Sequence, residues 1–290
     1  MKYKRKGIVL AGGYGTRLSP ITHAKSKQLI PIYDKPMIYY PISTLMLAGI
    51  NEILLITTPS EKESFKKLLG NGNQWGINIE YAVQDKPGGI AQAFLIAEDF
   101  IDKNPVCLIL GDNLFHGDKL GEKLTKSSLN YNDAIIFGYK VSDPQRYGVI
   151  TFDQNKKVIK IEEKPLIAKS PYVVTGIYFY DCDVVNMAKL LKPSKRNELE
   201  ITDLNNLYLK EKRLKVEILG RGMVWLDTGT FESLYEANTY VHTIQKRQGN
   251  IICCPEEIAY RSNWITLNEL KFLGKNFMKS EYGKYLLNLE

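Results

Sequence analysis

The segment IVLAGGYGTRLSPITHAKSK, residues 8–27, sets the organisation of the N-terminal half of the chain. Its first four residues are apolar and predict a buried strand, and the glycines that follow predict a turn. Two cations come next, Arg17 and Lys27. Because glycines expose main-chain N–H groups to an anion and Arg and Lys neutralise its charge, this order of residues predicts a phosphate site after the first strand.

Two common phosphate-binding motifs do not fit this segment. The P-loop pattern GxxxxGK[ST] is absent from the sequence, and the dinucleotide pattern GxGxxG needs a glycine at the position of Leu18. The remaining pattern, GGxGTR with a distant lysine, also fits an ordinary glycine turn after a first strand. The phosphate interpretation therefore depends on the motifs found later in the chain.

The composition is that of an ordinary globular protein. The chain has 290 residues, of which 44% are hydrophobic and 24% charged, which suits one large α/β domain or two small ones. The net charge of +7 comes from scattered lysines, with no arginine-rich arm or basic amphipathic helix. We therefore expect a solvated basic surface and no nucleic-acid partner.

The cysteines and the apolar runs indicate a compartment. The four cysteines form no CxxC pair and the three histidines are scattered, which favours structural thiols in a reducing compartment over a zinc site. No apolar run approaches the ~18 residues that would span a membrane, and the run behind the basic N-terminus is too short for a signal peptide. We expect a cytoplasmic protein without a membrane partner.

Strands and helices alternate over the first half of the chain. Apolar, β-rich runs predict strands at 7–11, 52–57, 79–84, 106–110 and 134–141, and helical spacing predicts helices at 37–48, 61–69 and 90–101, with a loop at 31–36. This alternation predicts an α/β fold with a mostly parallel central sheet flanked by helices. Ligands of such sheets bind beyond the carboxyl ends of the strands, so we expect the glycine turn and Asp112 in one site.

The pattern changes after residue 142. We predict a hairpin from strands at 147–152 and 158–161, further strands at 172–180 and 214–219, helices at 184–190, 203–211 and 230–248, a polar junction at 225–230, and helical pieces at 264–273 and 282–289. These elements predict a smaller α+β part laid over the same sheet, followed by a helical C-terminal tail.

Two aspartates are candidate metal ligands. Asp112 follows a buried strand and a glycine in VCLILGDN, and Asp227 lies in GRGMVWLDTGT. Mg²⁺ takes one or two carboxylates together with substrate phosphates and waters. The alternatives are a turn at Asp112 and a cap by Asp227 on the helix that begins near Phe231. The metal interpretation requires the fold to bring both carboxylates to one cation.

Several other motifs have a chemical and a plain interpretation. In EEKP, Pro165 favours an extended Lys164 that can reach a phosphate, and a solvated charge cluster is the alternative. The glycines near 148 and 176 offer a sugar ring access to the backbone, or merely end turns and strands. The Gln84 amide can read a base edge, with Gly89 beside it, although most loop glutamines have no such role.

The motifs AGGYGTRL…SKQ, YDKPMIYYP, LGDN, RYGV, EEKP, VTGIYFY, ELEITD, GRGMVWLDTGT and CCPEEIAYR occur in this order over essentially the whole chain. Together they resemble the sugar-1-phosphate nucleotidylyltransferase family, and within it the members that use dTTP and glucose 1-phosphate. No single motif is specific, but the combination is.

The resemblance implies a Rossmann-like nucleotidyltransferase fold, Mg²⁺ as cofactor, and transfer of dTMP from dTTP to α-D-glucose 1-phosphate with release of pyrophosphate, the first step of dTDP-L-rhamnose synthesis. It implies a catalytic domain at 1–250, with a nucleotide-binding part at about 1–141 and a sugar-binding part at about 142–230. Residues 251–290 would then be a helical segment for oligomer contacts.

The resemblance also implies roles for individual residues. Arg17, Lys27 and Lys164 are the expected catalytic cations, and Asp112 and Asp227 the expected metal ligands. The expected nucleotide contacts are Leu10, Gly12, Gly13, Gly15, Thr16, Arg17, Lys27, Gln84, Gly89 and Asp112. The expected sugar contacts are Tyr147, Gly148, Glu163, Lys164, Val174, Thr175, Gly176, Tyr178 and Trp225.

A second nucleotide site at subunit contacts, through which the product inhibits the enzyme, is a further implication. Its expected lining is His116, Gly117, Arg221, Glu257 and Arg261, and the expected assembly is a homotetramer. Interface ion pairs without any ligand are the alternative for the two arginines. Competing functions are a relative that uses UTP or another sugar phosphate, a catalytically silent sugar-nucleotide sensor, and an NAD-dependent oxidoreductase, which Leu18 disfavours.

Overall fold

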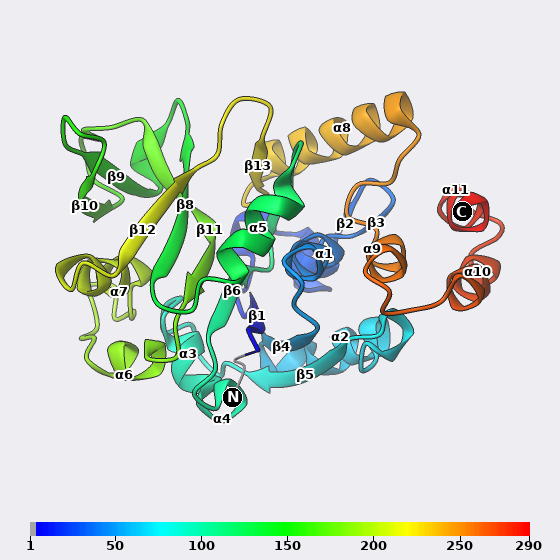
Figure 1. Ribbon diagram of the computed structural model, residues 1–290, viewed down its shortest axis with the longest axis horizontal. Helices are drawn as coiled ribbons and strands as arrows, with labels where there is room; N and C mark the ends of the chain where they lie inside the picture. The colour runs from blue at the N-terminus through cyan, green and yellow to red at the C-terminus, as the bar shows by residue number, and fades with distance from the viewer. Residues whose placement is uncertain (1–3) are drawn as a thin grey trace.

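The computed structural model describes residues 4–290 and is built around one mixed sheet (Figure 1). In this part of the chain the sheet has nine strands. Seven follow the path β10-β9-β11-β6-β1-β4-β5, and β8 joins this path through β11 and carries β12. The strands are β1 (Lys6–Ala11), β4 (Glu52–Thr57), β5 (Asn78–Val83), β6 (Val106–Leu110), β8 (Ala134–Lys140), β9 (Gly148–Phe152), β10 (Val158–Glu163), β11 (Tyr172–Tyr180) and β12 (Leu214–Ile218).

The strand directions divide this sheet into two parts. β5, β4, β1 and β6 are parallel, as the alternation of strands and helices predicts. β11 runs antiparallel to β6 and β8, and β9 and β10 form the predicted antiparallel hairpin. The second half of the chain therefore extends the sheet of the first half, and the predicted α/β fold class is confirmed.

Two short ribbons lie outside the main sheet. β2 (Pro31–Ile32) pairs with β3 (Lys35–Pro36), where the sequence predicted only a loop. β7 (Asn113–His116) pairs antiparallel with β13 (Val224–Asp227), so that Asp227 lies opposite Asn113. This second ribbon joins the end of β6 to the segment 227–230.

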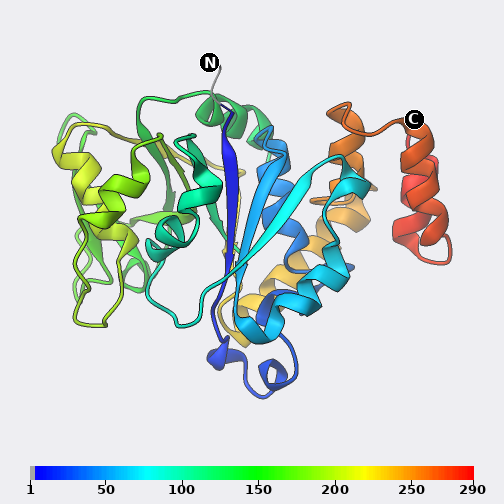
Figure 2. The same cartoon turned by 90° about the horizontal axis from the view of Figure 1, so that it is seen from below.

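Helices cover both faces of the sheet (Figure 2). They are α1 (Tyr39–Leu47), α2 (Lys62–Leu69), α3 (Gln92–Ile96), α4 (Glu98–Ile101), α5 (Leu120–Ser128), α6 (Val184–Lys189), α7 (Ile201–Lys210), α8 (Phe231–Gln248), α9 (Pro255–Arg261), α10 (Leu267–Asn276) and α11 (Glu281–Asn288). Among residues 4–290, none of these helices has the length and apolar character needed to cross a bilayer.

The central strands are buried on both faces. Val9 and Ile109 pack with α1, α2 and α5 in one hydrophobic core, whereas the neighbouring Ile8 and Leu108 pack with α3, α6 and α7 in another. All four side chains are fully buried. Because successive strand residues point to opposite faces, such strands must be apolar throughout, which is the pattern in the sequence.

Several details differ from the predicted elements, and α9 was not among the helical pieces predicted for the tail. The helix predicted at 90–101 is two helices, because the backbone at the fully buried Ala97 (φ −91°, ψ 9°) departs from helical geometry between α3 and α4. The helix α5 was not predicted, since its core contacts rest on only two leucines, Leu120 and Leu124. β7 and β13 replace a predicted turn and part of the predicted polar junction.

The start of α8 rules out the helix cap as the function of Asp227. The N-cap is Thr230, whose Oγ1 accepts a hydrogen bond from the Ser233 N–H (3.2 Å), while the Ser233 Oγ accepts one from the Thr230 N–H (3.0 Å). This capping box satisfies the free N–H groups of the first turn. The Asp227 carboxylate is left to face the interior of the site.

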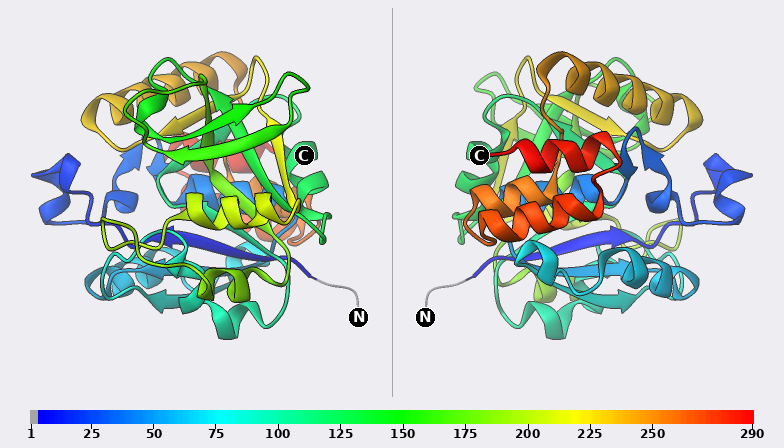
Figure 3. Two further views of the ribbon diagram at one scale, coloured as in Figure 1. Left: turned by 90° about the vertical axis from the view of Figure 1, so that its left-hand side faces the viewer. Right: turned by 90° about the vertical axis from the view of Figure 1, so that its right-hand side faces the viewer.

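The C-terminal helices α9, α10 and α11 form a separate group at one end of the molecule, remote from β9 and β10 (Figures 1 and 3). The nearly fully buried Glu256 on α9 accepts hydrogen bonds from the indole of Trp75 (3.1 Å) and from the hydroxyl of Tyr282 on α11. This carboxylate therefore links the tail to the body of the molecule.

Candidate active site

The loops that follow the parallel strands meet at one edge of the sheet. Leu10, near the end of β1, is paired with Leu110 at the end of β6, and Thr57 of β4 is paired with Val83 of β5. The glycine turn, Asp112 and Gln84 therefore leave the same edge, beyond which the segment after β1 projects (Figure 3). The predicted placement of the glycine turn and Asp112 at one edge is confirmed.

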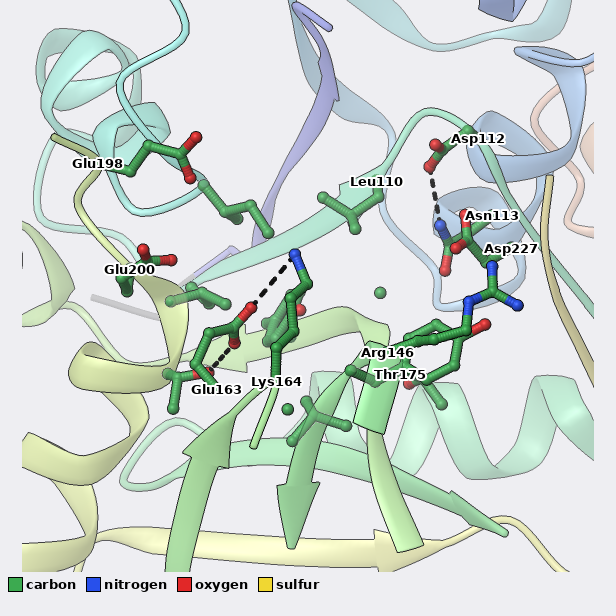
Figure 4. A pocket seen from close by; sticks show the side chains of 18 of the residues that line it. Leu110, Asp112, Asn113, Arg146, Glu163, Lys164, Thr175, Glu198, Glu200 and Asp227 are labelled. Carbon is green, nitrogen blue, oxygen red and sulfur yellow. Dashed lines mark hydrogen bonds and ion pairs between the residues drawn. The ribbon is translucent and has the colours of Figure 1, made fainter. Parts of the chain in front are cut away.

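A cavity of about 490 Å³ opens beside this edge, between the ends of β6, β10 and β11, the β7–β13 ribbon and the segment 196–202 (Figure 4). Its wall includes the following predicted residues: Arg17, Asp112, Tyr147, Gly148, Glu163, Lys164, Val174, Thr175, Gly176, Tyr178, Trp225 and Asp227. The structure thus brings the predicted sugar contacts, both aspartates and two of the three catalytic cations to one cavity.

The two aspartates stand on adjoining main-chain segments. The Thr228 N–H and Oγ1 both donate to the main-chain carbonyl of Asp112, at 3.2 and 2.8 Å, and Asp227 lies opposite Asn113 in the ribbon. Burial and then repulsion from Asp112 raise the pKa of Asp227. Burial opposes ionisation of Asp112 as well, but the Lys27 ammonium and hydrogen bonds from Lys27 and Asn113 outweigh it and hold the pKa of Asp112 below its usual value.

The cations approach this pair from the N-terminal segment. The buried Lys27 ammonium lies 2.5 Å from Asp112 Oδ2. Arg17 Nη2 and Asp227 Oδ1 lie 3.3 and 3.4 Å from the position that a Cβ at Gly229 would take, so both groups flank this glycine. Within residues 4–290 Arg17 forms no ion pair, which leaves its guanidinium available to an anionic ligand.

The glycine turn is shaped by its neighbours. A Cβ at Gly12 would lie 2.3 Å from Gln84 Oε1, so this glycine makes room for the Gln84 amide. Gly15 has φ 63° in the left-handed region and precedes the short 3-10 helix Thr16–Leu18, which carries Arg17. Leu10, Gly12, Gly13, Gly15 and Thr16 lie along the sheet edge and outside the wall of the cavity.

The loop after β5 is joined to the cavity wall. Gly89 has φ 93°, and a Cβ there would lie 2.3 Å from the carbonyl oxygen of Leu199. The Leu199 N–H donates to the Gly88 carbonyl (2.7 Å), and the Ala91 N–H donates to the Leu199 carbonyl (3.1 Å). Gln84 and Gly89 therefore border the segment whose residues Glu198 and Glu200 line the cavity.

Lys164 differs from its prediction. Its φ of 40° is left-handed and not extended, although Pro165 follows it. The Lys164 N–H donates to the Tyr147 carbonyl (3.0 Å), which continues the β9–β10 ladder by one residue before the chain turns away. Backbone strain of this kind persists where the surrounding structure imposes it, and it is concentrated at functional sites. The side chain points into the cavity beside Glu163 (Figure 4).

Asn113 connects several groups that line the cavity. It was not predicted from the sequence, because LGDN also fits an ordinary turn. Its Nδ2 donates to Asp112 Oδ1 (2.8 Å), and its Oδ1 accepts from the Trp225 indole (2.5 Å). A Cβ at Gly176 would lie 2.3 Å from Asn113 Oδ1, so Gly176 makes room for Asn113. The register of β11 against β8 is interrupted between Val174 and Tyr178, on either side of Gly176.

The segment 196–202 supplies further charged groups that the sequence reasoning did not name, although it quoted ELEITD. Arg196 Nη2 lies 2.7 Å from Glu200, 3.3 Å from Glu198 and 3.6 Å from Glu163. Thr202 Oγ1 donates to Glu163 Oε2 at 2.6 Å. Arg146 also lines the cavity and extends toward Asp227 (Figure 4). The signal for Arg146, Glu198, Glu200 and Thr202 was their place in the motifs RYGV and ELEITD. Arg196 lies outside the quoted motifs, and nothing in its spacing singles it out.

The predicted second nucleotide site is divided in the structure. His116, Glu257 and Arg261 line a second cavity of about 300 Å³ between β7 and the tail. Arg221 lies instead in a different cavity at the β12–β13 turn, and Gly117 packs against Gly222 and Met223 beside that turn. One chain therefore brings three of the five predicted residues together.

A family described as nucleotidyl transferase matches residues 6–244 of this chain. The chain belongs to the nucleotidyl transferase family. It is similar to the glucose-1-phosphate thymidylyltransferase of Xanthomonas campestris pv. campestris (strain B100), with 57% identity over 286 residues that cover 99% of this chain and 97% of the relative. The family membership makes the chain a nucleotidyltransferase enzyme.

Two solved structures support the same fold. One is a Bacillus anthracis protein described as a glucose-1-phosphate thymidylyltransferase in complex with sucrose, with TM-score 0.75 and 44% identity over 81% of this chain and 94% of that one. The other is a UDP-glucose pyrophosphorylase complexed with UDP-glucose, with TM-score 0.71 and 26% identity over 83% and 99%. The first of these structures is described as a complex with sucrose and the second as a complex with UDP-glucose.

Proposed function

We propose that this enzyme transfers dTMP from dTTP to α-D-glucose 1-phosphate, giving dTDP-glucose and pyrophosphate, with Mg²⁺ as cofactor. The observation that carries the proposal is the convergence of Asp112, Asp227, Arg17 and Lys164 on one cavity at the carboxyl edge of the parallel strands. The near full-length match to a relative of that name supports the choice of substrates. The reaction would be the first step of dTDP-L-rhamnose synthesis.

The donor set fits a divalent cation. Two carboxylates adjoin across the ribbon, and burial, followed by repulsion from Asp112, raises the pKa of Asp227 against the opposing effect of the neighbouring cations. Mg²⁺ prefers this environment of one or two carboxylates completed by substrate phosphates and waters. Bound there, Mg²⁺ would supply electrostatic stabilisation to the phosphates.

The chain itself supplies the remaining positive charge. An oxygen of the sugar phosphate attacks the α-phosphorus of the nucleotide, in line with the departing pyrophosphate. This oxygen is already an anion, so no serine, cysteine or histidine has to be activated. The barrier consists of repulsion between two anions and of charge that grows on the pyrophosphate. We assign Arg17 and Lys27 to the nucleotide phosphates and Lys164 to the sugar phosphate, where they act by positioning and electrostatics.

The sugar is held by the opposite wall in this proposal. Glu163 receives a hydrogen bond from Thr202 and keeps further acceptor positions for sugar hydroxyls. Gly148 leaves the backbone of β9 accessible, and Trp225, Tyr147 and Tyr178 provide aromatic surfaces. Arg196, anchored by Glu198 and Glu200, is a second cation for the sugar phosphate. These contacts support a phosphorylated hexose as the acceptor.

UTP is the second candidate nucleotide. The fold is shared with a UDP-glucose pyrophosphorylase, and thymine and uracil present the same hydrogen-bonding groups. Thymine differs from uracil by its methyl group, and UTP also carries a 2′-hydroxyl that dTTP lacks, so a contact to either feature would separate the two nucleotides. A catalytically silent sensor is a weaker alternative, because a silent protein need not retain both carboxylates and all three cations.

One assay tests these alternatives. Pyrophosphate release is measured with dTTP and UTP against glucose 1-phosphate and related sugar phosphates, with and without Mg²⁺. The proposal expects release with dTTP, glucose 1-phosphate and Mg²⁺, and none after chelation. Faster pyrophosphate release with UTP than with dTTP would make UTP the nucleotide substrate. No release from any pair of substrates by fully metal-loaded protein would contradict the proposal.

We also propose that the cavity beside the tail binds the dTDP-sugar end product at a contact between subunits of a homotetramer. Arg221 of a second copy can complete the group of His116, Glu257 and Arg261. Exposed apolar side chains on the tail, Phe272 and Phe277, offer surface for such contacts. Light scattering of the purified protein tests the tetramer. A strictly competitive effect of dTDP-rhamnose would contradict the second site.

A cytoplasmic location fits the four free cysteines, of which Cys107, Cys253 and Cys254 are buried. Fractionation of cells that express the tagged protein tests this location. Recovery in the soluble cytoplasmic fraction is expected.

A further inference from the structure

The amide of Gln84 is held in one orientation by Gln92, a residue outside the predicted site. Gln84 follows the last residue of β5 and is 5% exposed. Its Nε2 donates a hydrogen bond of 2.6 Å to Gln92 Oε1, the first side chain of α3. The main-chain N–H of Gly88 donates to the same oxygen at 3.0 Å. Gln92 therefore receives two hydrogen bonds on one atom.

The second of these bonds fixes the direction of the first. A main-chain N–H can only donate, so the Gln92 atom that it reaches must be the carbonyl oxygen. Gln84 must then offer its NH₂ group to that oxygen, and its own carbonyl oxygen is turned away. This oxygen lies over Gly12, where a Cβ would come within 2.3 Å of it. Among residues 4–290 it has no hydrogen-bond partner.

We infer that Gln92 is a positioning residue for base selection, because it holds a free hydrogen-bond acceptor of Gln84 toward the base. The inference rests on the proposed function, in which Gln84 contacts the base. Thymine and uracil carry an N–H donor at N3, whereas cytosine carries an acceptor there. The fixed carbonyl oxygen of Gln84 accepts a hydrogen bond from the N3–H of thymine or uracil and repels the N3 acceptor of cytosine.

Without Gln92 the Gln84 amide can rotate and offer its NH₂ group instead. The enzyme then loses part of its discrimination against cytosine nucleotides. The structure also shows why a smaller or apolar residue at 92 would not suffice, since the Gly88 N–H would lose its partner at the same time. The two hydrogen bonds to Gln92 thus connect the end of β5, the loop after it and the start of α3.

Two matched variants separate positioning from a structural role. Gln92→Glu keeps a side chain of the same reach with oxygen acceptors for both donors, whereas Gln92→Met keeps the length and removes the acceptor. Titration calorimetry measures the binding of dTDP and dCDP, and steady-state kinetics measures kcat/KM with dTTP and dCTP. The thymine-to-cytosine ratios are compared for each variant, because the negative charge of the glutamate weakens the binding of both nucleotides alike.

We expect Gln92→Met to lower the preference for dTDP over dCDP by about ten-fold, the scale of one mismatched hydrogen bond. Gln92→Glu should keep the wild-type ratio within about two-fold. A wild-type ratio in folded Gln92→Met would overturn the inference. If that variant does not fold, Gln92→Asn, which keeps the amide but cannot reach Gln84, takes its place with the same expected result.

The outcome is separable from that of the proposed function. Nucleotide binding is measured without sugar phosphate, so the ratio is defined even if wild-type enzyme releases no pyrophosphate. A failed release assay with an altered binding ratio would reject the reaction and keep the role of Gln92. Normal pyrophosphate release with an unaltered binding ratio would keep the reaction and reject the role of Gln92.

Discussion

The two cavities described for the proposed catalytic and regulatory sites differ in how their charges are satisfied. The central cavity gathers residues from 17 to 227 along the chain. Its charged groups include the exposed Arg17, which forms no ion pair within residues 4–290, and a pair of aspartates that repel each other. In the tail cavity, Arg261 is paired with Glu257 at 2.7 Å within one helix, and His116 shares a 2.7 Å hydrogen bond with Tyr240. The burial of His116 lowers its pKa, so it is neutral near pH 7.

This difference between the two cavities shows which of them can be assigned a function from its charged groups alone. Unbalanced charge that is withdrawn from water costs stability, so a fold that keeps the partly buried Asp112 and Asp227 side by side keeps them for a ligand or a metal. In the tail cavity the charged side chains Glu257 and Arg261 pair with each other, so a ligand there must compete with an existing ion pair. Changes in the central cavity should therefore alter catalysis by orders of magnitude, and changes in the tail cavity should leave basal catalysis intact.

The largest effect is expected from Arg17→Ala. The variant removes the unpaired guanidinium beside Asp227, and we expect kcat to fall about 100- to 1000-fold, the scale of one lost charged transition-state contact. Steady-state release of pyrophosphate measures it. Arg247→Ala, which removes an exposed arginine on α8, is the control and should behave as wild type. Wild-type turnover by Arg17→Ala would contradict its assigned role.

The second-largest effect is expected from a change in the two proposed metal ligands, Asp112 and Asp227. Asp227→Asn removes one of the two carboxylates, and we expect about 100-fold lower activity at saturating substrates and a higher Mg²⁺ concentration for half-maximal rate. A Mg²⁺ titration of the rate measures both quantities. Glu236→Gln, on the exposed side of α8, is the control. An unchanged Mg²⁺ dependence would show that Asp227 is not a ligand.

Lys164→Ala should have a smaller and more selective effect. Its ammonium is half exposed and lies 3.6 Å from Glu163, so it is free to bind a phosphate. We expect KM for glucose 1-phosphate to rise about ten-fold, with KM for dTTP little changed. Lys160→Ala, on the strand β10 that ends one residue before Lys164 and outside the cavity wall, is the matched control. Equal increases in both KM values would place Lys164 on the nucleotide instead.

The smallest effect on catalysis is expected in the tail cavity. Arg261→Ala breaks the ion pair with Glu257, and we expect basal kcat/KM to stay within about two-fold because exposed pairs contribute little to stability. Inhibition by dTDP-rhamnose should weaken in the same variant. Inhibition curves at several dTTP concentrations test this. Undiminished inhibition would remove the cavity as the regulatory site.

Sequence reasoning was most successful where one local signal determines the structure. The apolar run ending at Ala11 and the run ending at Leu110 are buried on both faces, so composition alone identifies them as central strands and places the glycine turn and Asp112 together. The adjacency of Asp112 and Asp227 depended on pairing between residues 113–116 and 224–227, which no local pattern predicts.

The remaining differences have the same origin. Asn113 gains much of its role from Trp225, which lies 112 positions away, and Arg196 gains its role from carboxylates on two segments. Lys164 adopts a left-handed backbone against the preference imposed by Pro165, because its N–H is held by Tyr147 across the hairpin. Tertiary contacts that override a local preference cannot be read from the local sequence.

The direct test of the account is the position of the metal. Crystals of the enzyme grown with dTTP and Mn²⁺, which replaces Mg²⁺ and scatters anomalously, would locate the cation in a difference map. We predict a peak in contact with the carboxylates of both Asp112 and Asp227 and with the nucleotide phosphates. A peak that touches neither carboxylate, in crystals with nucleotide bound, would contradict the account.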